Sequence, residues 1–244
     1  MRILAIETAT IEVGVAVADE TGPLATVTAR PGSRQAETLH PAIQDVCRIA
    51  RLTPAELDAI AVDIGPGLFT GLRVGVAAAK ALAGALGLPV VTATSLEVLQ
   101  AACPSVLGTV VPVIDMRRGE VAWLMPARPA SKIRVGTPAE LAAELMELTG
   151  LTGLAGPAGG AGRVLLAGDG ALRHREQLER TVVPAPVFGG VELAAPPVAS
   201  LAVLAIAAMK DGRCCDPAAV GPFYGREADA RINWSARDGR EAVS

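Results

Sequence analysis

Apolar and polar positions in the first hundred residues alternate between strand-like runs and helical periods. Short apolar runs bounded by turn residues indicate strands, and apolar positions three or four apart indicate helices. Leu39, Ile43, Val46 and Ala50 share one face in this way. The pattern predicts, in order, three strands, a helix, a strand, a helix, a strand and a helix, at 2–6, 13–18, 24–29, 38–51, 59–64, 70–86, 88–92 and from 95 onward.

The second half of the chain repeats this order. Two capping boxes, Thr53-Pro54-Ala55-Glu56 and Thr137-Pro138-Ala139-Glu140, open a short helical turn and a helix to about 148. The other elements expected here are strands at 109–114, 120–125, 132–135 and 163–167, a helix after Asp169 and a last helix at 197–210. The repeated order is that of two α/β ribonuclease-H-like units, which we place at 1–104 and 105–244, the second with a C-terminal tail.

The segment Asp63–Gly75 (DIGPGLFTGLRVG) joins the fourth strand to the alanine-rich helix at 70–86. Gly65, Pro66 and Gly67 end the strand, and Thr70 is expected to cap the helix. Small residues then recur every four positions, so another backbone can approach that face closely. The pattern fits either packing inside the domain or contact with another chain.

The helix at 38–51 also carries apolar residues on more than one face, which favours contact between molecules. We therefore predict a partner interface on the two helices. Its residues are Leu39, Ile43, Val46, Gly71, Leu72, Gly75, Val76, Ala79 and Ala83.

Composition limits the classes of function. Of the 244 residues 51% are hydrophobic but only 2% aromatic, so the core is aliphatic. The net charge of −3 and the lack of a basic run argue against nucleic-acid binding without a partner. Four cysteines without zinc spacing indicate reduced thiols, and the N-terminus carries no signal-peptide pattern. We expect a cytoplasmic protein with no membrane association.

Acidic residues end the first strand of each half, at Glu7 and Asp115. In duplicated folds of this kind such strand ends face each other across a cleft that can hold a nucleotide. Equally, Glu7 can accept hydrogen bonds from its own loop, and Asp115 with Arg117 and Glu120 can form a tight charged turn. The candidate nucleotide contacts are Glu7, Thr8, Thr10, Gly65, Gly67 and Asp115.

Motifs for other chemistry are missing from the sequence. There is no GxxxxGK[ST] loop, no GxSxG elbow and no Cys–His–acid set. The glycine turn at Gly65 has no acid at the end of the next strand to bind a ribose, which argues against a dinucleotide-dependent oxidoreductase. His40 and His174 lack neighbours at metal-ligand spacing, so we predict surface histidines and no metal site.

Four segments resemble the TsaB (YeaZ) family: ILAIETAT, GPGLFTGLRVGVAAAKALA, VIDMRRGEVAW and GPFYGR. The resemblance covers nearly the whole chain and is strongest over 3–95. It implies the actin/sugar-kinase/heat-shock-70 fold. It also implies a scaffold that pairs with the transferase TsaD and the ATPase TsaE in making N6-threonylcarbamoyladenosine in tRNA. In this family the first two helices of the N-terminal unit contact TsaD or, without it, form a homodimer.

The chain departs from the family pattern at two places. Glu7 stands where the family has aspartate, and 35–39 lacks the histidine pair that TsaD uses to bind metal, with His40 alone beside it. The resemblance therefore implies a non-catalytic dimerisation and activating subunit that contacts tRNA only through the complex. It implies no intrinsic cofactor, with ATP or ADP at a shared interface. The alternative is a small ATP-dependent phosphotransferase or ATPase of the same fold. No residues support a peptidase.

Overall fold

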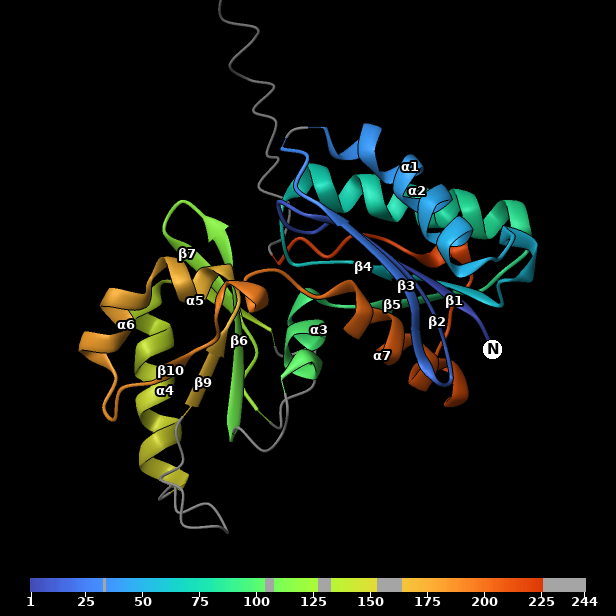
Figure 1. The fold of residues 1–244 in the computed structure, drawn as a ribbon. Coiled ribbons are helices and arrows are strands. Elements are labelled where there is room, and N and C mark those ends of the chain that lie inside the picture. The colour runs from blue at the N-terminus through green and yellow to red at the C-terminus, as the bar shows by residue number, and fades with distance from the viewer. Residues whose placement is uncertain (33, 104–107, 127–132, 153–163, 226–244) are drawn as a thin grey trace, which may run out of the picture.

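The computed structural model describes residues 1–32, 34–103, 108–126, 133–152 and 164–225. Two five-stranded mixed sheets form the centres of two lobes (Figure 1). The first has the order β3-β2-β1-β4-β5, in which β1 is antiparallel to β2 and parallel to β4. Its strands are β1 (Ile3–Glu7), β2 (Val13–Asp19), β3 (Gly22–Ala29), β4 (Ala59–Asp63) and β5 (Val90–Ala93).

The second sheet repeats the first. Its order is β8-β7-β6-β9-β10, again with an antiparallel meander on one side and parallel strands on the other. The duplicated α/β fold of two ribonuclease-H-like units is thus confirmed. The strands are β6 (Thr109–Arg117), β7 (Glu120–Trp123), β8 (Arg134–Gly136), β9 (Val164–Ala167) and β10 (Val187–Phe188).

Helices cover both faces of the first sheet. Helices α1 (Gln35–Ala50) and α2 (Phe69–Leu86) lie side by side on one face, and α7 (Val198–Lys210) covers the other (Figure 1). Alternate strand residues serve the two cores: Leu4 and Ile6 pack under α1 and α2, whereas Ile3 and Ala5 pack against α7.

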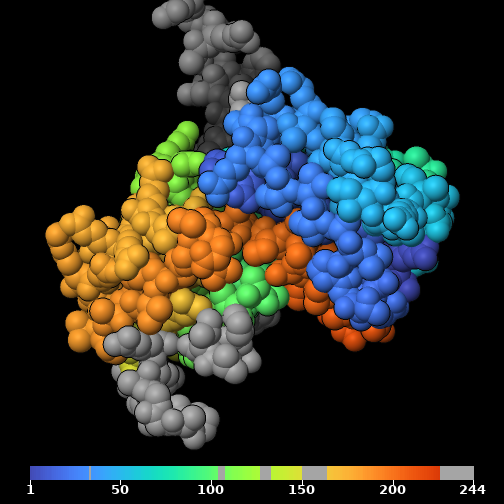
Figure 2. All heavy atoms as spheres, viewed as in Figure 1, coloured from blue at the N-terminus to red at the C-terminus, as the bar shows by residue number. Residues whose placement is uncertain are grey.

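The second sheet carries α4 (Pro138–Thr152), α5 (Asp169–Arg173) and α6 (Arg175–Thr181). Helix α3 (Ser95–Ala102), from the first half of the chain, packs Leu96 and Leu99 against Ile114 of β6. In the space-filling view the late, orange part of the chain reaches across between the lobes (Figure 2). The domain boundary at 104/105 stays a prediction, and α7 packs on the first sheet although it follows the second.

Most strand bounds agree with the sequence pattern to within a few residues, but both helix starts on the first sheet differ. Helix α1 begins at Gln35, three residues before the predicted start, and includes Pro41 in its interior. The buried Gln35 side chain donates to Thr10 O at 2.6 Å. Helix α2 is capped by Leu68, whose backbone is extended, so the predicted cap at Thr70 is wrong. The expected strand residue Lys132 and the loop at 153–162 lie outside the described residues.

Helix α2 is long and apolar enough, by length and composition, to cross a membrane, a test that core helices also pass. Its Leu72, Ala79 and Ala83 are fully buried in the molecule. Its sheet-facing side is therefore part of the core, and the question is what its other apolar side contacts.

Candidate functional site

The small-residue side of α2 packs inside the lobe. A Cβ atom added at Gly71 would lie 2.0 Å from Thr8 O, and one at Gly75 would lie 2.2 Å from Thr8 Oγ1. Ala79 and Ala83 are fully buried over the sheet. The close approach that the sequence pattern indicated is thus made by the loop after β1, and these residues present no surface to a partner.

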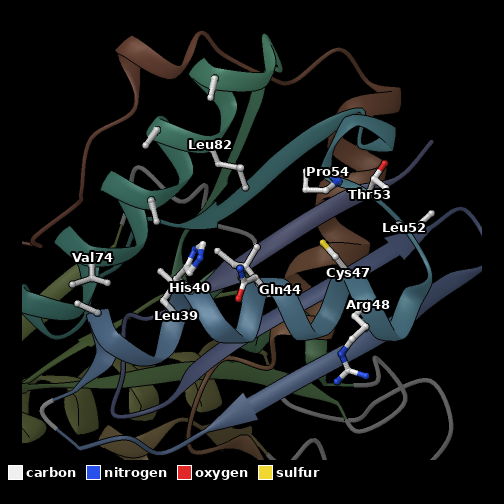
Figure 3. Close-up of a pocket in the computed structure, with 15 residues that line it drawn as sticks. Leu39, His40, Gln44, Cys47, Arg48, Leu52, Thr53, Pro54, Val74 and Leu82 are labelled. Atoms are coloured by element: carbon white, nitrogen blue, oxygen red, sulfur yellow. The ribbon is translucent and has the colours of Figure 1, made fainter.

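An apolar groove of about 840 Å³ lies beside this side of α2, between α1 and α2 and with 52–54 at one end (Figure 3). The lining residues of α2 precede or follow the small residues by one or two positions, which places them about 100° or more around the helix. The groove is lined by Ala36, Leu39, His40, Ile43, Gln44, Cys47, Arg48, Leu52, Thr53, Pro54, Val74, Ala78, Ala81, Leu82 and Ala85.

Only part of the predicted interface lines this groove. Leu39 and Ile43 do, because they lie on the side of α1 that faces α2. The prediction is corrected for the rest, which do not line the groove and are buried against the first sheet or the loop after β1. These are Val46, Gly71, Leu72, Gly75, Val76, Ala79 and Ala83.

A signal for the groove was present in the sequence. Positions 74, 78, 81, 82 and 85 form a second apolar stripe on α2. On an alanine-rich helix two such stripes look alike, so the pattern did not show which one faces the sheet. Polar groups of the groove come mainly from α1: Figure 3 shows His40, Gln44 and Arg48 along it.

The carboxyl end of the first sheet holds most of the candidate nucleotide contacts. Glu7 and Asp63 end the adjacent strands β1 and β4 and are 1% and 0% exposed. Thr8 and Thr10 are also buried, and Thr8 Oγ1 donates to Gly71 O at 2.8 Å. Thr8, Glu7 and Asp63 thus each hydrogen-bond to nearby backbone, and one oxygen of each acid receives no donor.

The glycines of the turn after β4 lie against other backbone. A Cβ atom at Gly65 would lie 2.5 Å from Phe223 O, and one at Gly67 would lie 2.2 Å from Ala9 O. Gly65 also has a φ of +104°, which side-chain-bearing residues rarely adopt. Both positions need glycine for packing within the chain.

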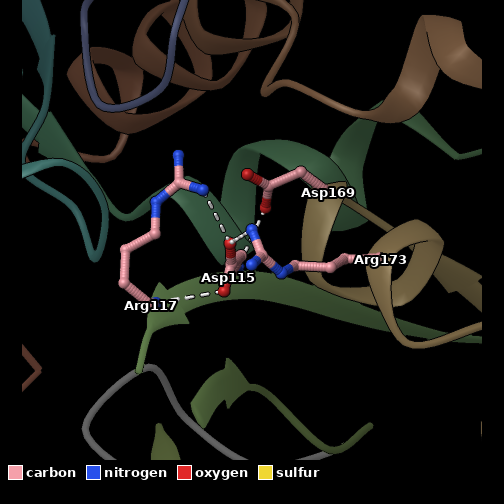
Figure 4. Close-up of polar contacts among 4 residues, drawn as sticks. All are labelled: Asp115, Arg117, Asp169 and Arg173. Carbon is pink, nitrogen blue, oxygen red and sulfur yellow. Dashed lines mark hydrogen bonds and ion pairs between the residues drawn. The ribbon is translucent and has the colours of Figure 1, made fainter. Parts of the chain in front are cut away.

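At the corresponding end of the second sheet, Asp115 is neutralised by arginines (Figure 4). Its Oδ2 pairs with Arg117 at 3.0 Å and with Arg173 at 3.1 Å, and its backbone N–H donates to Asp169 at 2.9 Å. Burial raises the pKa of Asp169. The alternative interpretation of Asp115 as part of a charged turn matches these contacts, and as nucleotide contacts all six candidates stay predictions.

The histidines lie apart. His40 is exposed on α1, and His174 is half-buried between α5 and α6. Within the described ranges no three His, Cys, Asp or Glu side chains gather to hold a metal ion.

Comparison with known proteins gives a consistent result. Residues 29–181 match the family described as "TsaD: tRNA N6-adenosine threonylcarbamoyltransferase". An uncharacterised protein of Mycobacterium tuberculosis is 40% identical over 146 residues, which cover 58% of this chain and 65% of that protein. The chain thus spans just under two thirds of that relative.

Two other similarities extend over nearly the whole chain. The tRNA threonylcarbamoyladenosine biosynthesis protein TsaB of Bacillus subtilis is 28% identical over 96% of this chain and 98% of its own length. A Pseudomonas aeruginosa crystal structure, described as an uncharacterised protein with similarity to peptidase YeaZ, has a TM-score of 0.74 and 27% identity. The alignment covers 92% of this chain and 99% of that one.

Proposed function

Because this chain belongs to the TsaB (YeaZ) family, within the TsaD family of proteins, we propose that it is a non-catalytic dimerisation and activating subunit for tRNA threonylcarbamoyladenosine formation. In this role it scaffolds TsaD, which carries the transferase site, and TsaE. It contacts tRNA only through the complex, in the cytoplasm.

The α1–α2 groove is the observation that carries this proposal. Ala81 and Ala85 are exposed, and Ile43, Val74 and Leu82 are partly buried, so an apolar surface lies open along both helices. Burial of apolar surface of this extent against a partner lowers the free energy of the complex. Both helices fall within the range that matches the TsaD family. A TsaD protein would thus bring a related helix pair to the groove.

The two carboxyl ends of the sheets support a scaffold over the alternative ATPase. Asp115 is already paired with two arginines, and Glu7 and Asp63 are enclosed. A phosphotransferase needs carboxylates that are free to hold a metal–phosphate group. We propose no intrinsic cofactor, with ATP or ADP held only where partner chains meet, and no peptidase activity.

The test compares two substitutions of the same type on α2. Ala81→Arg places a charge in the groove, whereas Ala77→Arg places it on an exposed position of the same helix that does not line the groove. We expect Ala81→Arg to weaken binding to a co-purified TsaD protein at least about tenfold, because the charge would be buried unpaired. Calorimetry of the purified pair measures this.

Ala77→Arg should bind like the unsubstituted protein. Equal affinity for both variants, each with an unchanged unfolding midpoint, would place the TsaD contact elsewhere. Loss of binding in both would show that charge anywhere on α2 disturbs the protein, and would not support the groove.

A further inference from the structure

Glu7 and Asp63 lie side by side in the closed interior. Strands β1 and β4 are parallel neighbours with Ile6 opposite Val62, and the two acids follow these residues. Since side chains alternate along a strand, both carboxyl groups leave the sheet on the same side. The pair is therefore in contact and shielded from bulk water.

Other residues donate hydrogen bonds to one oxygen of each carboxyl group. Glu7 Oε1 accepts from Ala9 N at 2.7 Å, and Asp63 Oδ1 accepts from Gly65 N at 2.7 Å and Ser95 Oγ at 2.9 Å. Glu7 Oε2 and Asp63 Oδ2 are buried and receive no donor from any other residue. A proton on one of these neighbouring carboxyl groups would let it donate to the other and would satisfy both remaining oxygens.

Two further acidic side chains lie near the pair. Besides burial, the negative charge of Glu12 raises the pKa of Glu7, and that of Glu97 on α3 raises the pKa of Asp63. A small cavity of about 200 Å³ beside Glu7 is lined by Glu12 and Glu192, and α7 contributes Val198 there. No lysine, arginine or histidine among the described residues lines this cavity. The described lining of this cavity therefore supplies no positive charge to Glu7.

We propose that Glu7 and Asp63 share a single proton and form a latch that ties the loop after β1 to the turn after β4. The proton makes one carboxyl a donor and leaves one negative charge, which the N–H groups of Ala9 and Gly65 stabilise. Losing the proton places two negative charges against each other in the interior.

The latch holds the starts of the two groove helices. Leu68 N, at the cap of α2, donates to Ala9 O at 2.6 Å. Gln35, at the start of α1, donates to Thr10 O at 2.6 Å. Separation of the carboxyl groups would therefore loosen the loop after β1, to which the starts of both α1 and α2 are hydrogen-bonded. These contacts lie within this chain, whether or not the groove binds a partner.

The pKa directions agree with this geometry. Burial, and then the neighbouring Asp63, raise the pKa of Glu7 well above its ordinary value. Folded protein therefore holds a proton that unfolded chain releases, and this stability is present below the unfolded pKa and lost as pH rises through the folded pKa.

Urea unfolding from pH 5 to pH 9 tests the latch in the full chain. We expect the unfolding equilibrium constant to rise by up to about tenfold per pH unit above the unfolded pKa of Glu7. Glu7→Gln, which keeps an N–H donor without the titration, should remove this rise. Glu192→Gln, a change of the same type at an exposed residue lining the same cavity, should keep it.

If Glu7→Gln folds poorly, two measurements on the unsubstituted protein test the shared proton instead. Infrared spectroscopy of the unsubstituted protein at pH 7 should show the C=O band of a protonated carboxylic acid, and its absence would overturn the proposal. Stabilisation of the unsubstituted protein by Mg²⁺ or Mn²⁺ alone, with loss of that band, would assign the pair to a cation instead of a proton.

Discussion

Two glycines, at 67 and 71, allow the loop after β1 to touch the start of α2. Side chains there would overlap the carbonyl oxygens of Ala9 and Thr8, at 2.2 and 2.0 Å. Contact between two backbone segments is stiff, because neither partner can rotate away as a side chain can. At the scale of single residues, the segment that looked suited to a ligand or partner is a packing contact.

Gly71→Ala should destabilise the protein by about 1–3 kcal/mol or more, because the added methyl meets backbone. Gly84→Ala, on the same helix with no atom within 4 Å of the added Cβ, should stabilise it by about 0.5–1 kcal/mol. Chemical unfolding of both variants measures the difference. Equal effects would mean that the close approach to Thr8 relaxes at little cost.

At the scale of elements, residues 215–225, the last segment that the structure describes, pack on the first lobe. Cys215 pairs with Val90 of β5, and Phe223 N donates to Ile64 O at 2.7 Å. The Tyr224 ring lies 5.0 Å from that of Phe69, and its hydroxyl accepts from Arg73 Nε at 3.0 Å. The GPFYGR motif of the sequence therefore serves, through Phe223 and Tyr224, to hold β4 and α2.

Lys80 of α2 also holds this segment, donating to Ala218 O at 3.1 Å and Val220 O at 2.8 Å. Lys80→Met keeps the apolar stem but removes the ammonium, and should cost about 1–2 kcal/mol. Limited proteolysis should then cut at 215–225 sooner. Lys210→Met, at an exposed lysine on α7, is the control and should be cut like the unsubstituted protein.

At the scale of the whole molecule, the two lobes repeat one topology but leave different surfaces. Helices α1 and α2 of the first lobe leave a large apolar groove open. In the second lobe, by contrast, Asp115 of β6 forms ion pairs with Arg117 and Arg173. The two lobes share one topology, and the proposed contact surface belongs to the first lobe.

The purified chain should form a homodimer through the groove when no TsaD protein is present. Because apolar contact is not screened by salt, the dissociation constant should change little between low and high ionic strength. Sedimentation equilibrium with and without added salt measures it. A monomer at all concentrations, or a dimer that salt disrupts, would contradict an apolar interface.

Sequence reasoning determined the elements and their order because periodicity is local. Strand runs and capping boxes such as Thr53–Glu56 and Thr137–Glu140 depend on residues within a few positions of one another. The repeated order was sufficient to predict two ribonuclease-H-like units, although β6 runs to Arg117 and so includes Asp115, which the prediction placed just after a strand ending at 114.

Tertiary structure alone decided which side of α2 is core and which is surface. Gly71 and Ala81 are both small residues on one alanine-rich helix, but Thr8, far away in sequence, covers the first and leaves the second open. It also brought Asp63 against Glu7 across two strands. Both facts depend on contacts between distant residues, and local patterns of apolar and polar positions do not contain them.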